Sequence, residues 1–287
     1  MKKSGTLLLA LSTLSLLAGC GVVNKVVGGD GKKNETPTLG NRVDILGSAR
    51  DTVADPSIAN IAVILPPPVA APNWAQPGGN AAKAPGHVEL GQNLSQVWTA
   101  QVAGSTPRAR LASSPVVNDG KLFVVDTDGM VSAFDAATGA RAWSASMGVS
   151  GDGKPTVFGG GASANGTMVF ATNGYGDVAA IQASDGAVVW KKHPAGPLRG
   201  SPTISNGNVY AMTQDNQIYA LRASDGEPVW NEAGPSGVSG IFGVAAPAAA
   251  QGTVIAGYST GELSAYRYEN GRSVWADTLS RTAMSTS

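Results

Sequence analysis

Cysteine is almost missing from this chain of 287 residues, which contains only Cys20. No disulfide can form within the chain, so packing has to stabilise the fold. Charge is also scarce, at 14% of residues, and Lys plus Arg balance Asp plus Glu at 20 each. A nucleic-acid-binding protein would need a basic surface to meet phosphates, so this charge balance argues against that class. Convincing helix-period apolar stretches are lacking as well, which argues against a helical fold.

The patterns that would mark a catalytic or metal site are also lacking. The two histidines, His87 and His193, show no metal-ligand spacing. Asp126-x-Asp128-Gly129 resembles the opening of a calcium loop but lacks the later oxygen ligands and the closing Glu, which favours a simple turn. Residues 159–161 are three glycines without a following Lys, so they form no phosphate loop. We therefore expect no catalytic residue, metal, cofactor or small-molecule substrate.

The N-terminus has the pattern of an export signal. Lys2 and Lys3 precede an apolar run over residues 7–17, which is too short for a comfortable membrane span. The run ends in Leu-Ala-Gly followed by Cys20, which resembles the bacterial lipobox; the alternative is an ordinary signal peptide with an incidental Cys. That resemblance implies a signal peptide over residues 1–19, cleavage before Cys20, and acylation, with palmitate among the chains. Gly21 stands where Asp would favour retention at the inner membrane, so we expect an anchor in the outer membrane, facing the periplasm.

Residues 20–88 form the second predicted region, which contains the lipidated Cys, a flexible tether and a Pro-rich approach. The tether is rich in Gly, Asn and Lys over residues 21–41. Three consecutive prolines at positions 66–68 predict an extended segment that is poor in hydrogen bonds. Trp74 lies in the sequence NWAQPGGN, where we expect its ring to pack on the repeat body; the alternative is a role in binding a partner. His87 is expected at the surface.

The rest of the chain is organised by a tryptophan that returns every 40 to 47 residues. Four copies share an Ala ten residues before the Trp and a Gly four residues before it. The series consists of Trp98, Trp143, Trp190, Trp230 and Trp275. A period in the forties with short strands is typical of a β-propeller with one four-stranded blade per repeat. Residues 89–287 are therefore predicted to be all-β.

Turn and strand signals recur inside each repeat. A first turn is predicted at Asp119-Gly120, Asn165-Gly166, Asn206-Gly207 and Gln251-Gly252, each followed by a β-branched and aromatic strand. A second turn ends at Gly129, Gly176, Asn216 and Gly261. Asn is the non-glycine residue that best tolerates the left-handed region, so its presence at the third position indicates a conformational requirement there.

Packing between adjacent blades explains why the Ala and the Trp recur. A small residue lets the neighbouring sheet approach, and a large ring fills the space between adjacent blades. The alternative is that the rings form a cofactor box or a sugar-binding stack. A Trp at a fixed register in every repeat is more simply explained as a structural dock.

The phrase A-x-D-x-x-T-G-x-x-x-W, closest over residues 133–143, resembles the quinoprotein-type propeller repeat. Together with the lipobox, the approach and the repeats, it makes the chain similar to the BamB family, whose members assist the folding of β-barrels into the Gram-negative outer membrane. This resemblance implies a non-catalytic, eight-bladed scaffold that binds the periplasmic POTRA domains of BamA within the BAM complex. The enzyme alternative is a pyrroloquinoline quinone dehydrogenase, in which the propeller axis holds a quinone and calcium, or another ligand-binding propeller.

A Leu-Arg-Gly element before a blade contacts BamA in that family, and Leu198, Arg199 and Gly200 match it. Arg combines an apolar stem with a planar head and five donors, which suits an interface. The resemblance therefore implies a partner-contact role for these three residues. The alternative is an ordinary loop between blades with a solvated Arg199.

The repeat count departs from the family. Four Ala–Trp units are present where eight are implied, so the sequence predicts an open arc of four blades and a fragment of a longer propeller. The strand around Trp98, over residues 94–102, has no repeat before it and is predicted to close a ring. Such an arc would expose sheet edges and one blade face.

Overall fold

In the computed structural model, the described residues are 55–58, 60–106, 110, 114–148, 159–236 and 243–279. The predicted signal peptide, Cys20, Gly21 and the glycine-rich tether lie outside these residues. The chain divides into two units, residues 1–63 and 64–287. In the first unit the described part holds one 3-10 turn, η2 (Pro56–Ile58). No helix among the described residues is both long and apolar enough to cross a bilayer.

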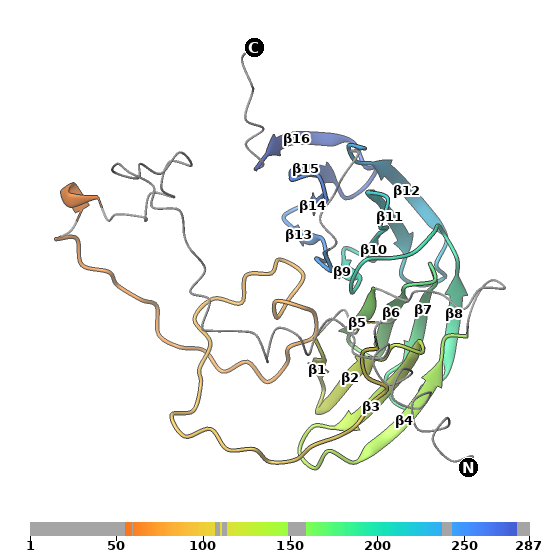
Figure 1. Cartoon of the computed structure of the whole chain (residues 1–287). Helices are drawn as coiled ribbons and strands as arrows, with labels where there is room; N and C mark the ends of the chain where they lie inside the picture. The colour runs from red at the N-terminus through yellow and green to blue at the C-terminus, as the bar shows by residue number, and fades with distance from the viewer. Residues whose placement is uncertain are drawn as a thin grey trace, which may run out of the picture. The chain divides into compact units, whose positions relative to one another are not determined.

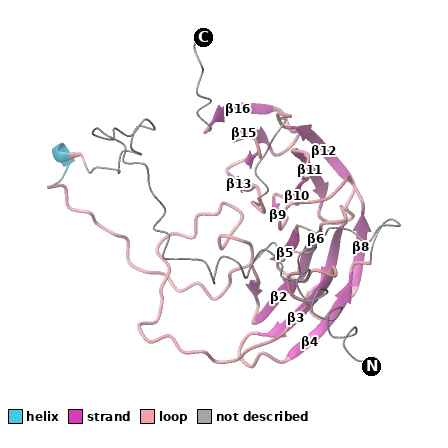
Figure 2. Ribbon diagram, in the orientation of Figure 1, coloured by secondary structure: helices cyan, strands magenta, loops and turns pink. Residues whose placement is uncertain are grey.

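The described part of the second unit contains four antiparallel sheets of four strands each, as the sequence predicts (Figures 1 and 2). The first sheet consists of β1 (Val116–Asn118), β2 (Lys121–Val125), β3 (Met130–Asp135) and β4 (Arg141–Ser146). The second consists of β5 (Gly160–Asn165), β6 (Met168–Asn173), β7 (Val178–Gln182) and β8 (Val188–Lys192). The third consists of β9 (Thr203–Ser205), β10 (Asn208–Met212), β11 (Gln217–Arg222) and β12 (Pro228–Ala233). The fourth consists of β13 (Ala248–Ala250), β14 (Thr253–Gly257), β15 (Glu262–Arg267) and β16 (Ser273–Thr278).

Each sheet is a simple meander in chain order, and the sheets succeed one another along an open arc (Figure 1). The first strand of each sheet lies on the inner side of the arc and the fourth on the outer side. The described strands close no ring, so this is a partial β-propeller of four blades. Residues 92–106 are described but form no strand, so the predicted closing strand around Trp98 is not formed among the described residues.

Positive φ angles confirm the predicted turns, with one exception. Gly129, Gly176, Asn216 and Gly261 all have φ between 64° and 102°, so Asn216 does occupy the left-handed conformation that its glycine counterparts adopt. Both central residues of the first turn have positive φ in the first, third and fourth sheets. The exception is the second sheet, where Asn165 is the last residue of β5 and pairs with Met168. Its turn is Gly166-Thr167, one residue later than predicted, because a glycine at the first position already supplies the positive φ.

One irregularity recurs at the same place in every sheet. The Ala of each repeat phrase lies directly opposite its Trp, and the register shifts by one residue immediately after that pair. An extra residue in one strand bends it and increases the local twist. The fixed spacing of ten residues between Ala and Trp therefore reflects a repeated pairing followed by a bulge.

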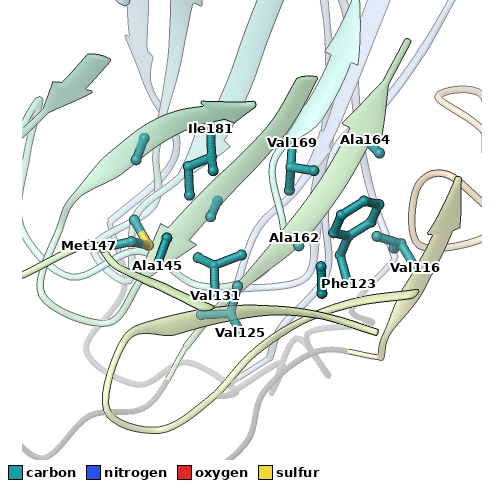
Figure 3. Close-up of a cluster of buried hydrophobic side chains, with 13 residues drawn as sticks. Val116, Phe123, Val125, Val131, Ala145, Met147, Ala162, Ala164, Val169 and Ile181 are labelled. Atoms are coloured by element: carbon teal, nitrogen blue, oxygen red, sulfur yellow. The ribbon is translucent and has the colours of Figure 1, made fainter. Parts of the chain in front are cut away.

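The hydrophobic core lies between the sheets and not within a single layer. Side chains of the first two sheets form one cluster, among them Phe123, Val131, Val169 and Ile181 (Figure 3). A second cluster joins the second and third sheets, and a third joins the third and fourth. Each sheet is thus held by the apolar face of its neighbours, as expected when single sheets cannot bury both faces alone.

Candidate functional site

Four of the five recurring tryptophans dock on a turn of the next sheet along the chain. Each indole Nε1 donates a hydrogen bond to a backbone carbonyl three residues after the recurring Ala of that next sheet. The bonds run from Trp98 to Ala136 at 3.0 Å, Trp143 to Ala183 at 3.0 Å, Trp190 to Ala223 at 3.0 Å and Trp230 to Tyr268 at 2.7 Å. A buried indole usually needs such an acceptor. The tryptophans therefore join consecutive sheets, which matches the structural reading of the series.

The recurring glycine provides the seat for this ring. A Cβ at Gly139, Gly186, Gly226 or Gly271 would lie 2.6–2.9 Å from the docked indole, well inside contact distance. All four glycines also have φ between 71° and 82°. Glycine is required here for two reasons, because only it accepts this backbone conformation cheaply and only it lets the ring approach.

On their own sheets, three of these rings face an aromatic side chain. Phe123 and Trp143 have centroids 5.9 Å apart, and the equivalent pairs in the second and third sheets lie at 6.1 and 5.8 Å. In the fourth sheet, Ile255 occupies this position opposite Ala265. Its tryptophan, Trp275, is 42% exposed, whereas Trp190 and Trp230 are 8% exposed. Among the described residues, no further sheet therefore covers Trp275, and all six residues of β16 are exposed.

A second connection runs along the inner strands. Residues 74–81 hydrogen-bond to one equivalent position in each of the four sheets; we call this segment the inner clasp. Val117 and Ala164 donate to the carbonyls of Trp74 and Ala75 at 2.9 and 2.7 Å, and Trp74 returns a bond to Val117 at 2.8 Å. In the fourth sheet, Ala249 donates to Ala81 at 2.8 Å. The approach segment thus satisfies edge groups that would otherwise be unpaired.

Gln76 makes the clasp contact with the third sheet through its side chain. Its Nε2 donates to the Ile204 carbonyl at 2.9 Å, and its Oε1 accepts from the Ile204 amide at 3.1 Å. The side chain is buried, so both amide groups pair with the backbone and imitate a strand residue. A turn at Gly78 and Gly79, with φ of 79° and 91°, lets the clasp continue to the fourth sheet.

The predicted partner element lies in the linker between the second and third sheets, and it is buried. Leu198 is fully buried in the core between these sheets, and Arg199 is 5% exposed. The Arg199 backbone amide donates to the Met212 carbonyl at 2.8 Å, and the Arg199 carbonyl accepts from the Gly160 amide at 3.2 Å. Burial lowers the pKa of Arg199. The alternative of a solvated Arg199 is therefore wrong, while the partner-contact role stays a prediction.

Gly200 is fixed by its surroundings. A Cβ at this position would lie 2.0 Å from the carbonyl oxygen of Val244, which precedes the fourth sheet. Only glycine allows the two segments to cross at this distance. The surface next to the element is formed by exposed residues of the preceding linker, namely His193, Gly196 and Pro197. A partner approaching this end of the sheets would meet these three residues first.

A buried carboxylate holds the start of that linker. Asp177, whose side chain is fully buried, lies 3.0 Å from His193 Nδ1 and 3.3 Å from Lys191 Nζ. It also accepts from Asn173 Nδ2 at 3.1 Å. Beside it, a Cβ at Gly176 would lie 2.2 Å from the Ala195 carbonyl, so turn and linker are in close contact. Sequence reasoning missed this cluster, because nothing in the repeat phrase marks the position of Asp177 as buried.

The other sequence candidates take ordinary structural places. Asp126 Oδ1 accepts from the amides of Asp128 and Met130 at 2.9 Å, so this carboxylate caps the turn that resembles a calcium loop. His87 is exposed and its Nδ1 lies 2.7 Å from the Pro66 carbonyl. Within the described ranges, no three His, Cys, Asp or Glu side chains come together as a metal site.

Comparison with known proteins gives one consistent family. A family model described as "Outer membrane protein assembly factor BamB" matches residues 92–157 and 127–287. Curated proteins of that name include one from Yersinia pestis, 28% identical over 65% of this chain and 49% of that protein. Another, from Burkholderia pseudomallei, is 30% identical over 66% of this chain and 47% of that protein. The chain therefore spans about half the length of the curated relatives it matches.

Solved structures of other proteins share the fold. The quinohemoprotein alcohol dehydrogenase from Comamonas testosteroni has a TM-score of 0.57 and 17% identity, with 73% of this chain and 41% of that chain covered. A europium-containing methanol dehydrogenase has a TM-score of 0.57 and 14% identity, with 73% and 49% covered. At such identities the likeness shows the fold alone.

Proposed function

Since residues 92–157 and 127–287 match its family model, this chain belongs to the family of outer membrane protein assembly factor BamB, and we propose that it acts as a non-catalytic scaffold in outer-membrane protein assembly. The observation that carries the proposal is this match, which covers all four sheets. Its partner is the BAM complex, through the periplasmic POTRA domains of BamA. A lipid anchor at Cys20 places it at the periplasmic face of the outer membrane.

The arrangement of the sheets suits a scaffold. Each pair of neighbouring sheets is joined by a tryptophan dock, and the inner clasp connects all four. The tryptophan docks and the inner clasp fix the sheets relative to one another. Loops at one end of the sheets are therefore held in place before a partner binds, so binding costs little conformational entropy. The linker over residues 193–200 is such a loop, and Asp177 and Met212 hold its two ends.

The clasp also argues against the quinoprotein alternative. That alternative needs access for a quinone along the inner edges of the blades. Here the backbone and side chains of residues 74–81 already pair with those edges in all four sheets. A quinone at the same edges would have to displace the chain's own hydrogen bonds, including the two made by the buried Gln76.

We propose that Leu198, Arg199 and Gly200 contribute to partner binding indirectly. These buried residues hold the exposed residues of the preceding linker in place, and the linker residues contact the partner. The test is binding of the full chain to immobilised POTRA domains of BamA. We expect retention of the chain, and at least a roughly ten-fold loss of affinity for Pro197→Asp and for Arg199→Ala. The control is Arg222→Asp, because Arg222 is exposed and lies at the opposite end of the third sheet.

Unchanged affinity of a folded Arg199→Ala variant would reject the assignment of this element. Absence of any binding by the unaltered chain would reject the scaffold proposal itself. Circular dichroism of each variant separates a lost contact from a lost fold, since Arg199 is buried and Pro197 is exposed.

A further inference from the structure

A pocket between the first and second sheets is lined mainly by polar residues. Its volume is about 280 Å³, and it lies where the first turn of one sheet meets two turns of the next. Its apolar lining includes Phe123, which is fully buried, and Ala183, whose carbonyl accepts the bond from Trp143. Five of its polar side chains are those of Asp119, Lys121, Thr167, Gln182 and Ser184.

Hydrogen bonds fix the walls of this pocket. Asn118 Nδ2 donates to the Gly166 carbonyl at 2.9 Å, which joins the first turns of the two sheets. The Ala183 amide donates to the Thr167 carbonyl at 2.8 Å, so the two turns of the second sheet are also joined. A pocket whose walls are already held in place loses little entropy when a ligand enters.

The five polar side chains have hydrogen-bonding groups available for a ligand. In the part of the chain that the structure describes, none of them makes a side-chain hydrogen bond or an ion pair. Lys121 lies in register with Asp135 across the hairpin, but Asp135 Oδ1 accepts from the amide and the hydroxyl of Thr138, both at 2.8 Å. The donors and acceptors of the pocket are therefore not satisfied by the described chain itself.

At the next two junctions between sheets, side chains of the chain pack at the equivalent positions. Met168 replaces Lys121 at the second junction, where it packs with Ala223 against the core. At the third junction Tyr268 replaces Ala183 and packs against the core, and Asn208 Nδ2 lies 3.4 Å from its carbonyl. Among the three junctions of the described sheets, the first is the one with a charged side chain at this position.

We propose that this pocket binds a neutral, hydroxyl-rich ligand of the size of one sugar ring. Lys121 and Asp119 have opposite charges, so the lining has no net charge to select an ion. An ammonium group donates, a carboxylate accepts, and hydroxyl and amide groups do both. Hydroxyl groups of a ligand also donate and accept, so a ring with several hydroxyls matches this mixed lining.

Size and apolar surface agree with a sugar ring. A volume of about 280 Å³ lies at the lower end of the range for ligand pockets, so it limits the ligand to about one ring. The competing ligand is a small zwitterion, whose two charges would pair with Lys121 and Asp119. The other three polar side chains, however, are neutral and favour hydroxyl groups. The proposal rests on the pocket alone and is independent of the proposed scaffold function.

The indole N–H resonances of the six tryptophans give a readout that locates binding. Trp143 Nε1 donates to the carbonyl of Ala183, which lines the pocket, whereas Trp190 and Trp230 dock at the next two junctions. The isotope-labelled full chain is titrated separately with D-glucose, D-galactose, D-mannose and N-acetyl-D-glucosamine, and Trp143→Phe identifies the resonance. We expect at least one sugar to shift the Trp143 resonance with a dissociation constant on the order of 1 mM. The Trp190 and Trp230 resonances should not move, and glycine, as a zwitterion, should shift none of the three.

Lys121→Met is the informative variant, because it introduces at the first junction the side chain that packs at the second. We expect sugar binding to weaken by at least roughly ten-fold, since the variant removes a donor and fills the pocket. The matched control, Lys192→Met, makes the same replacement at the next junction, where Lys192 pairs with Glu227, and should bind like the unaltered chain. Thr167→Val keeps the shape of the side chain and removes one hydroxyl, so it provides a second, milder loss of affinity.

A Trp143 resonance that moves with none of the four sugars would overturn the proposal. Unchanged sugar affinity in Lys121→Met and Thr167→Val variants that circular dichroism shows to be folded would also overturn it, and so would a stronger response to glycine than to any sugar. None of these measurements includes a BAM subunit, so their failure would leave the scaffold proposal standing.

Discussion

Replacing a seat glycine by alanine tests whether the tryptophan docks hold the sheets together. A Cβ at Gly226 would lie 2.7 Å from the Trp190 ring and 2.7 Å from the Lys192 Cγ. Gly207 has the same φ of +73°, but nothing lies within 4 Å of a Cβ there. Gly226→Ala and Gly207→Ala thus share the backbone strain of about 1–2 kcal/mol. Only the first also displaces the ring, at an added cost of about 1–3 kcal/mol.

The expected free energies of unfolding are therefore lowered by about 1–2 kcal/mol for Gly207→Ala and about 2–5 kcal/mol for Gly226→Ala. Urea unfolding monitored by far-UV circular dichroism measures both, and oxidation of Trp190 should increase only in Gly226→Ala. Equal destabilisation by the two variants would refute the reasoning, because the strain alone would then account for the effect.

Three further predictions concern the clasp and two buried charges. Gln76→Ala leaves two buried backbone groups of β9 unpaired and should lower the free energy of unfolding by about 2–4 kcal/mol. Asn80→Ala, in which an exposed side chain bonded to Ala84 is removed, should cost less than about 1 kcal/mol; urea unfolding measures both. Asp177→Asn removes a fully buried carboxylate from Lys191 and from its contact with His193 Nδ1, and should cost about 1–3 kcal/mol. Glu227→Gln, in an exposed pair, should cost less than about 1 kcal/mol; thermal unfolding that ranks the two variants the other way would contradict this. Burial lowers the pKa of Lys83 from 10.5 to about 8, so the folded chain binds fewer protons than the unfolded chain between these values, and stability should rise with pH across that window. Lys83→Met should raise stability at pH 7 and flatten the rise, which melting curves between about pH 7 and pH 10.5 would show.

Local signals made the sheets predictable from the sequence. Turn residues with positive φ, β-branched strands and the Ala–Trp spacing each depend on a few neighbouring residues, and they recur four times. Asn216 is the clearest case, since its place among three glycines predicted the left-handed φ of 64° that it adopts. The error at Asn165-Gly166 has the same local origin. An Asn-Gly pair is a strong hairpin signal, yet here its Asn still belongs to the strand and the glycine opens the turn.

The repeat pattern could not predict contacts between residues far apart in the sequence. Gln76 and Ile204 are separated by 128 positions, and no periodic signal links the approach segment to the inner strands. The burial of Asp177 depends on a linker that packs over its turn, while the equivalent position carries Met130 in the first sheet and Gln217 in the third. The burial of Leu198 and Arg199 has the same cause, because linkers between the sheets do not repeat.

The contacts of the recurring phrase cannot be predicted from any single copy, because the Gly of one copy packs against the Trp of a different copy. Gly139 receives Trp98, and Gly186 receives Trp143, so each phrase supplies the ring for one junction and the seat for the previous one. Both partners are present for the phrases of the first, second and third sheets, where the Gly receives one Trp and the phrase's own Trp packs on the next Gly. Trp275 belongs to a phrase whose seat is filled by Trp230 but whose ring has no seat among the described residues. The exposure of Trp275 is therefore set by its spatial neighbours and not by its own phrase, which has the same pattern as the phrases of the buried rings.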